Sequence, residues 1–400
     1  MATINQQIAD TVKDLKPYLL QFSHTIHEMP ELSFEEHKTA AYIEDQLEQH
    51  GFVVQRGTYN MPTAFTATYG SGSFNAVICA EYDALPDIGH ACGHNIIAAM
   101  SIGAALALQP LADKLGITIT VQGTPAEEHG GGKAILVERG AWEHATISLM
   151  AHGTPGNDDT LCENNHCRSV DRFDITYTGK SAHADAFPTL GVNAMSAATI
   201  ALTAIGLIRQ QLADDVHINA YVSHGGEVTN IIPETSTVRI EVRATDNTTL
   251  ETAVKAVMRC FDAGAVATGC AWESKRAEPR YESLNQDPIL AKAWDDELAA
   301  LGRNLDPKRV VCGGSTDMGN VSWVVPSIHP SIAVLGSIAS PHTRQFATDA
   351  ATTAGDQTCI DGAIALAQVV AFAASPEHRS HFLELQKARK PGQTMIPCGL

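Results

Sequence analysis

Three apolar segments, each followed closely by polar residues, constrain the fold of this chain more than any other feature. Residues 74–80, 117–123 and 147–152 have the composition of buried strands. The Ala-rich residues 96–108, between the first two, are apolar nearly all round and predict a buried helix. Strands that alternate with helices predict an α/β fold with an open sheet. In such sheets, ligands bind beyond the carboxyl ends of the strands.

From about residue 168 the pattern changes to strand–helix–strand–strand–helix–strand, which is typical of a small ferredoxin-like α+β unit. Beyond residue 287 the first pattern resumes. A chain of 400 residues is long for one hydrophobic core. We therefore expect a discontinuous first domain, residues 1–166 and 282–400, with a second domain inserted at 167–281.

Composition excludes several classes of protein. A net charge of −18 argues against a nucleic-acid partner, because phosphate binding requires a basic surface. No stretch approaches the ~20 apolar residues of a membrane span, and the polar N-terminus lacks the apolar core of a signal peptide. Nine cysteines without a disulfide pattern fit a reducing compartment. These observations predict a cytoplasmic protein that does not contact a membrane.

Six residues spread over most of the chain carry thiolate, imidazole or carboxylate groups, which Zn²⁺ and similar cations select. They are Cys92, His94, Glu127, Glu128, His152 and His342. A carboxylate beside the ligands would serve a hydrolytic metal site as its proton carrier. The set predicts a metal-dependent hydrolase with two metal ions.

Cys92 and His94 lie two residues apart in a Gly-containing loop, where both side chains can turn toward one centre. A dication readily removes the proton of a thiol ligand. The alternative is a buried free cysteine beside solvent-facing histidines. We interpret the neighbouring His90 as structural.

Glu127 and Glu128 are adjacent, and adjacent residues of an extended backbone point in opposite directions. The two carboxylates are therefore expected to do different work. We assign Glu127 as the general base and Glu128 as a metal ligand. The alternative is the ordinary preference of a helix N-terminus for acidic residues.

Other candidates remain open on sequence pattern alone. Asp83 is either a hydrogen-bond partner of a ligating imidazole or a turn residue before a proline. Nothing local separates His342 from His329 as the last ligand. His183 belongs to the inserted domain, where it is either a group that stabilises an oxyanion or a surface histidine.

Several motifs together resemble the M20 metallopeptidases, subfamily D, and they cover nearly the whole chain. In order along the sequence they are EYDALPDIGHACGHN, GTPAEEHGGGK, MAHG, GKSAHADAFPTLGVNA, GEVTNIIP and SPHTRQFA. Asn95 stands where the general subfamily pattern has Asp. This matches the branch that contains aminobenzoyl-glutamate hydrolase B and Xaa-Arg dipeptidase-like proteins.

The resemblance implies a catalytic domain with a central mixed sheet flanked by helices, and an inserted dimerisation and lid domain that makes a homodimer. It also implies two Mn²⁺ or Zn²⁺ ions per subunit bridged by Cys92, and it favours His342 over His329. The remaining ligands would then be His94, Glu128, His152 and His342.

The same resemblance gives roles to residues outside the ligand set. Glu127 would activate water and Asp83 would support the site. His183 would serve the active site of the neighbouring subunit, and Asn230 would contact the substrate. Arg243 and Arg344 are further candidates, since a guanidinium can clamp a carboxylate with two hydrogen bonds.

The expected reaction is cleavage of the amide bond in a dipeptide or an N-acyl or aroyl amino acid with a free carboxylate. One alternative is an aminoacylase that acts on simple acyl groups. Another is a catalytically silent homologue that holds metal and a small ligand. The complete set of ligands and base argues against the silent homologue.

Overall fold

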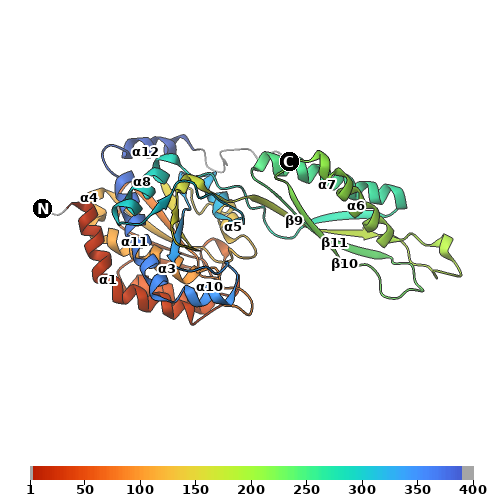
Figure 1. The fold of residues 1–400 in the computed structure, drawn as a ribbon, viewed down its shortest axis with the longest axis horizontal. Coiled ribbons are helices and arrows are strands. Elements are labelled where there is room, and N and C mark those ends of the chain that lie inside the picture. Colours follow the sequence, from red (N-terminus) through yellow and green to blue (C-terminus); the bar gives the residue numbers. More distant parts are fainter. Residues whose placement is uncertain (1–2, 390–400) are drawn as a thin grey trace. The chain divides into compact units, whose positions relative to one another are not determined.

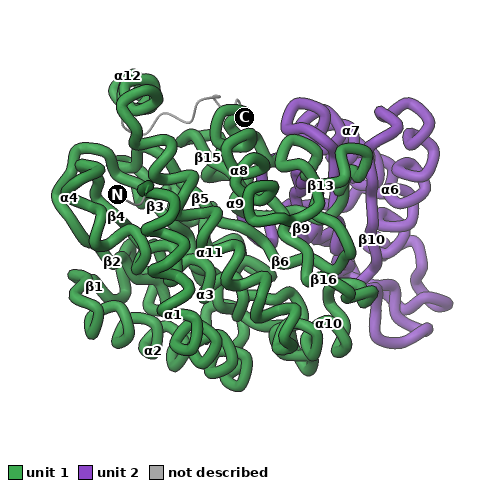
Figure 2. Tube along the Cα trace, turned by 60° about the vertical axis from the view of Figure 1, so that its left-hand side comes forward, with its two compact units in different colours: residues 1–166, 284–400 green, residues 167–283 purple. Residues whose placement is uncertain are grey.

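The computed structural model describes residues 3–389, which belong to two compact units (Figure 2). Unit 1 consists of residues 1–166 and 284–400, and unit 2 of residues 167–283. The boundaries expected from the sequence were 1–166, 167–281 and 282–400. Each unit has its own hydrophobic core.

Unit 1 is built on a mixed six-stranded sheet with the order β1-β2-β4-β3-β5-β15. Its strands are β1 (Val53–Arg56), β2 (Phe65–Tyr69), β3 (Phe74–Ala80), β4 (Ile117–Gly123), β5 (Ile147–Leu149) and β15 (Ser327–Ile328). β2 is antiparallel to both β1 and β4, whereas β3, β4, β5 and β15 run parallel. The expected mixed sheet is confirmed.

The parallel strands of unit 1 end close together. Ala80, the last residue of β3, pairs with Gly123, the last residue of β4. On the other side of β3, Ile78 pairs with Leu149, the last residue of β5. Segments that follow these strands therefore begin at one edge of the sheet, and the candidate residues lie in those segments.

Helix α3 (His94–Leu108) lies at the centre of unit 1, and every one of its residues is buried. It packs against the helices α1 (Ile4–His27) and α11 (Thr353–Ala373), as Figure 1 shows, and against the strands β3, β4 and β6 (His152–Gly156). Small side chains on α3 permit this close packing: at Gly103, an added Cβ would lie 2.8 Å from the Cβ of Ala363. The remaining helices of unit 1 are α2 (His37–Gln49), α4 (Ala112–Leu115), α5 (Gly132–Glu138), α8 (Pro288–Ala300), α9 (Met318–Ser322), α10 (Arg344–Asp349) and α12 (Arg379–Ala388).

Within the described residues, one helical segment is long and apolar enough to cross a membrane, His94–Leu115. Its apolar window is 89% buried inside the protein, as expected for a core helix.

Short parallel pairs complete unit 1. β6 (His152–Gly156) pairs with β16 (Ser331–Leu335), β7 (Asp159–Thr160) with β13 (Leu305–Asp306), and β8 (Asn165–His166) with β14 (Val311–Cys312). The expectation of one strand over residues 147–152 is therefore wrong. β5 ends at Leu149, and His152 begins β6, because the His152 backbone N donates to Pro330 O at 2.9 Å and starts a new ladder with β16.

Unit 2 is a four-stranded antiparallel sheet with the order β10-β11-β9-β12, covered by α6 (Ala194–Ile208) and α7 (Asn247–Thr268). Its strands are β9 (Ser169–Thr178), β10 (His217–His224), β11 (Thr235–Ala244) and β12 (Ala271–Arg276). Together with the strand–helix–strand–strand–helix–strand order along the chain, this is the ferredoxin-like arrangement. Its core contains Phe173, Tyr177 and Phe261.

Candidate metal centre

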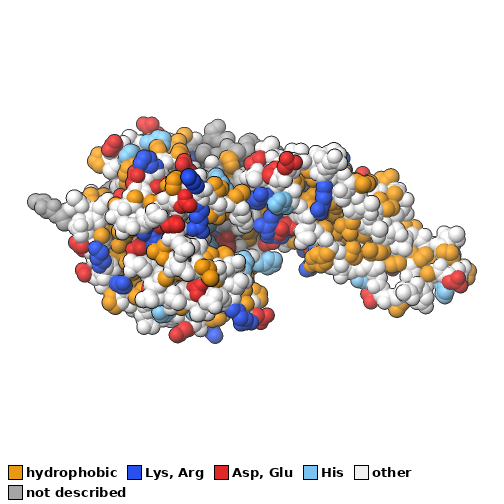
Figure 3. Space-filling view, in the orientation of Figure 1, with side chains coloured by type: hydrophobic (Ala, Val, Ile, Leu, Met, Phe, Trp, Pro, Cys, Tyr) orange, Lys and Arg blue, Asp and Glu red, His pale blue; other side chains and the backbone are white. Residues whose placement is uncertain are grey.

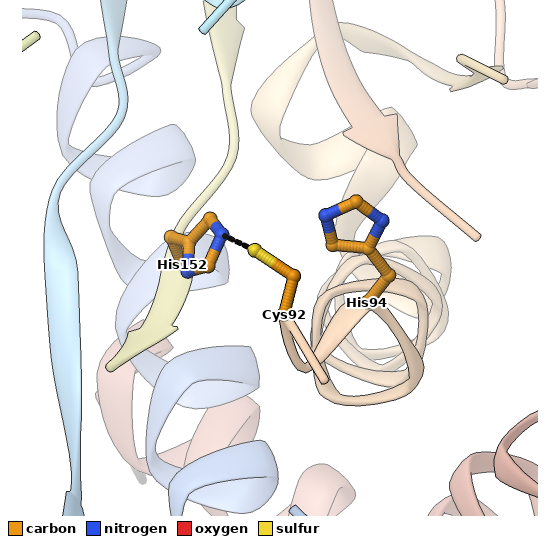
Figure 4. A group of neighbouring side chains, drawn as sticks. All are labelled: Cys92, His94 and His152. Atoms are coloured by element: carbon orange, nitrogen blue, oxygen red, sulfur yellow. Dashed lines mark hydrogen bonds between the residues drawn. The ribbon is translucent and has the colours of Figure 1, made fainter. Parts of the chain in front are cut away.

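The loop before α3 brings Cys92 and His94 to the edge of the sheet. Gly93 lies between them with a φ of 78°, a left-handed conformation that glycine adopts without steric cost, and α3 begins at His94. The Cys92 Sγ atom lies 3.3 Å from His152 Nε2, and the two side chains point toward each other (Figure 4). The other ring nitrogen of His152, Nδ1, donates to Gly153 O at 2.9 Å. The lone pair of neutral His152 therefore points toward the thiol.

His94 is oriented by Asp83, which follows β3. The Nδ1 atom of His94 lies 2.8 Å from Asp83 O and 3.0 Å from Asp83 Oδ1. Asp83 Oδ2 accepts from Ser33 Oγ and from the backbone N of Glu128, both at 2.9 Å. Because Nδ1 is held by Asp83, the Nε2 atom of His94 faces the interior of the site. This is the arrangement that orients imidazole ligands in metal sites.

Glu127 and Glu128 follow a strained turn after β4. Ala126 has a φ of 62°, which is uncommon for a residue with a side chain. Its backbone N donates at 2.9 Å to Oε1 of the fully buried Glu36, which fixes the turn. Burial and the neighbouring charge of Asp83 raise the pKa of Glu36 to about 7.

His342 reaches the same edge from the C-terminal part of unit 1. Its Nε2 atom lies 3.3 Å from Glu128 Oε2, and its backbone N donates to Ala91 O at 2.9 Å. The His329 ring lies 5.8 Å from the His152 ring, centroid to centroid, but His329 belongs to none of the metal-type clusters of the described residues. The structure thus brings His342 to the candidate ligands, whereas sequence pattern had left the two histidines equal.

Three overlapping clusters of candidate ligand atoms lie at this edge, with the atoms of each cluster within 4.8 Å of one another. They are Cys92, His94 and His152; Cys92, Glu128 and His342; and Glu81, His94 and Glu127. Cys92 is common to the first two clusters, which is the position that a bridging ligand requires.

The donor atoms fit a cation. Buried polar atoms in proteins nearly always have a hydrogen-bond partner. At this edge, His94 Nε2, Glu81 Oε2 and Glu128 Oε1 are buried and have none among the described residues. Thiolate, imidazole and carboxylate donors in this proportion suit Zn²⁺ and related transition metals.

The electrostatics separate the two adjacent glutamates. Burial and the charges of Glu81, Glu128 and Asp317 raise the pKa of Glu127 well above its ordinary value. Glu128 is half-buried, and although burial raises its pKa, its hydrogen bond with His342 and the charge of His94 lower it overall. Glu128 is therefore held in the anionic form that a metal ligand needs. Glu127 has the higher proton affinity expected of a group that takes up a proton.

Asp83 is strongly ionised in spite of its burial. Burial opposes its charge, but the charge of His94 and hydrogen bonds from His94, Glu128 and Ser33 lower its pKa to about 2. A permanent negative charge behind an imidazole strengthens that imidazole as a ligand.

Sequence reasoning missed three residues here. Lys133 is fully buried and contacts Glu81 and Asp317, and neither Lys133 nor Asp317 belongs to the predicted set. Glu36 lies outside the predicted set as well, because an acid at the start of a helix such as α2 has an ordinary explanation. A charged residue in the Gly-rich stretch after Glu128 was the one signal that could have drawn attention to Lys133.

The candidates of unit 2 lie on two paired segments. His183 forms an isolated bridge with Ile231, and Ala184 N donates to Asn230 O at 2.9 Å. His183 and Asn230 are both exposed. Arg243 pairs within unit 2, since its Nε atom donates to Glu241 Oε1 at 2.5 Å. In unit 1, Arg344 is exposed at the start of α10, two residues after His342.

Residues 166–268 match the model of the peptidase dimerisation domain of the M20 family. The chain is 34% identical to the Xaa-Arg dipeptidase of Mus musculus, with 91% of this chain and 87% of that protein covered. It is 25% identical to one of the subunits of the p-aminobenzoyl-glutamate hydrolase of Escherichia coli, with 67% of this chain and 59% of that protein covered.

Among solved structures, a dinuclear metal-binding peptidase of the M20 family from Bacillus subtilis shares the fold. The TM-score is 0.68 at 22% identity, with 90% of this chain and 99% of that chain covered. The fold, the matched domain and the identity to the mouse protein agree with the motifs. The chain therefore belongs to the M20 family of metallopeptidases and is an enzyme of that class.

Proposed function

We propose that the protein hydrolyses the amide bond of a dipeptide, or of an N-acyl or aroyl amino acid, with a free carboxylate, and that two divalent cations assist the reaction. The observation that carries the proposal is the overlap of two ligand clusters at Cys92, beside the buried carboxyl group of Glu127. His94 and His152 belong to one of these clusters, and Glu128 and His342 to the other.

Cations at these positions would polarise the scissile carbonyl and lower the pKa of water. Glu127 takes the proton of the attacking water and returns it to the leaving nitrogen. Its Oε2 atom lies 3.9 Å from His94 Nε2, at the border of the ligand set. Asp83 holds the His94 ring so that Nε2 faces the candidate ligands.

The substrate class is supported by the names of the relatives, a dipeptidase and a hydrolase of an aroyl amino acid. Arg344 is exposed and close in sequence to His342, which suits a contact with the substrate carboxylate. The net charge of −18 favours the approach of cationic substrates. Dipeptides that end in arginine are therefore the first to be tried.

The assembly and compartment are also proposals. We propose a homodimer through unit 2, supported by the matched dimerisation domain. Hydrophobic side chains gather on the visible surface of unit 2 (Figure 3), and the exposed ones of this unit include Leu207, Tyr221 and Val266. In such a dimer His183 would stabilise the oxyanion and Asn230 would contact the substrate. Buried cysteines such as Cys79, Cys162 and Cys359 are free thiols, which suits the cytoplasm.

The test is a metal-dependent substrate panel. Protein stripped with a chelator should lose activity and regain it with Mn²⁺ or Zn²⁺, and metal analysis of protein purified without added ions identifies the native ion. The panel contains dipeptides ending in arginine, aminobenzoyl-glutamate and N-acetyl amino acids. Hydrolysis of the acetyl compounds alone would replace the proposal with an aminoacylase. No turnover by metal-loaded protein would leave a silent metal-binding homologue.

A further inference from the structure

Lys133 is a buried lysine between two carboxylates, next to the candidate ligands. It has no exposed surface, and its Nζ atom contacts Glu81 Oε1 and lies 2.7 Å from Asp317 Oδ1. Its backbone N also donates to Asp317 Oδ2 at 2.7 Å. Asp317 thus holds both the main chain and the side chain of Lys133. Lysine is almost never fully buried unless it is paired, and these two carboxylates provide the pairing.

The contact with Lys133 gives the two oxygens of Glu81 different surroundings. Oε1 is taken by Lys133, whereas Oε2 is buried, has no hydrogen-bond partner among the described residues and lies 3.5 Å from His94 Nε2. Glu81, His94 and Glu127 together form one of the clusters with metal-type donors. The carboxylate is therefore fixed at one end and open at the other, and the open end faces the candidate metal centre.

We propose that Lys133, anchored by Asp317, is a positioning residue that turns the open oxygen of Glu81 toward His94 and so strengthens the binding of the cation that His94 helps to hold. The inference rests on the proposed function in one respect, because it takes the edge of the sheet to be a metal centre. The carboxylate charge of Glu81 adds to the attraction for a dication at short range.

A purely structural ion pair would look different. Arg303, elsewhere in unit 1, is also buried between two carboxylates, those of Asp159 and Asp361. There, Asp159 Oδ2 accepts from Arg303 Nε at 2.6 Å, and Asp159 Oδ1 accepts from the Ala333 backbone N at 2.7 Å. Both oxygens of that buried carboxylate have partners, as is usual in protein interiors. Glu81 departs from this rule only on the side of the metal centre.

The experiment measures Co²⁺ binding to metal-free protein by visible absorption, in which the cobalt–thiolate band reports binding at Cys92. Lys133→Met removes the cation that orients Glu81. Glu81→Gln keeps an oxygen for Lys133 but removes the charge that faces His94. Both variants should weaken Co²⁺ binding by about 10–100-fold, the usual effect of losing a group that supports a ligand. Arg303→Met is the matched control, since it also removes a buried cation but should leave Co²⁺ binding unchanged while it lowers the melting temperature.

The outcomes separate this inference from the proposed function. Loss of Co²⁺ affinity in Lys133→Met and Glu81→Gln, but not in Arg303→Met, supports it. Wild-type Co²⁺ affinity in Glu81→Gln overturns it, and this result is informative even if Lys133→Met fails to fold. Wild-type protein that binds Co²⁺ but cleaves no substrate would overturn the proposed hydrolysis and leave the positioning role standing.

Discussion

Lys133 and Arg303 are both buried cations that lie between two carboxylates in unit 1. They differ in whether the surrounding hydrogen-bond network is complete. Around Arg303, the guanidinium donates to Asp159, to Asp361 and to Ala333 O, and it closes a local network. Around Lys133, the network ends at Glu81 Oε2, which has no hydrogen-bond partner within the described part of the chain. Leaving a buried acceptor unsatisfied costs about 1–3 kcal/mol or more. The complete network around Arg303 connects parts of the fold, whereas the one around Lys133 ends at an atom that faces the candidate metal centre.

The largest effect is expected at Glu127, which belongs to the same cluster of candidate ligand atoms as Glu81. Glu127→Gln keeps the size of the side chain but cannot accept a proton, so kcat should fall by about 10²–10⁴-fold, which is the usual contribution of a general base. Metal content, measured on the same protein, should stay at the wild-type value. Glu138→Gln, on the exposed face of α5, is the control and should have wild-type turnover. Near wild-type kcat in Glu127→Gln would refute the assignment of the base.

A smaller effect, on metal binding, is expected at Asp83, which connects His94 to neighbouring segments of unit 1. Its two oxygens accept from His94 on one side and from Glu128 N and Ser33 on the other. An amide at this position places a donor against a donor in either orientation, so Asp83→Asn should weaken metal binding by about 10–100-fold.

Calorimetric titration of the metal-free protein with Zn²⁺ measures the effect of Asp83→Asn. Ser33→Ala removes a single hydrogen bond and should weaken binding less. Equal metal affinities of Asp83→Asn and the wild type would show that Asp83 acts only as a turn residue.

The smallest effect on the reaction is expected at Arg303, whose hydrogen-bond network is complete. Arg303→Met leaves the buried Asp159 without its cation, and the free energy of unfolding should fall by roughly 3–5 kcal/mol. Urea unfolding monitors the stability, and kcat is then measured under conditions in which the variant is folded. We expect an unchanged kcat. A kcat that falls with stability would mean that the two networks are linked.

Much of the candidate site could be predicted from the sequence because its residues follow strands. Asp83 follows shortly after β3, and Glu127 and Glu128 follow shortly after β4, so local sequence placed them at one edge of the sheet. The alternation of side chains along an extended backbone also suggested different surroundings for the two glutamates. The mixed sheet and the ferredoxin-like unit could be predicted from the periodicity of apolar residues and from the family motifs.

The rest depended on contacts between distant segments. Lys133 meets Glu81 across 52 positions and Asp317 across 184 positions, and no local pattern signals such a contact. His342 reaches the candidate ligands by contacts with distant segments, since its backbone N donates to Ala91 O in the loop before α3 and its ring contacts Glu128. The break after β5 escaped prediction because the apolar residues Met150 and Ala151 continue the strand pattern, whereas the competing partner of His152 is a strand far along the chain.

The position of His342, beyond unit 2 in the chain, has a consequence for biosynthesis. Cys92, His94, Glu128 and His152 are made early, but His342 is made only after the whole of unit 2. At about 5–20 residues per second, a ribosome needs roughly 10–40 s to travel from His152 to His342. During that interval the nascent chain carries a thiol and two imidazoles whose last companion has not yet been translated. A divalent ion captured by the growing polypeptide would therefore be held by an incomplete set of donors until the final part of unit 1 is released.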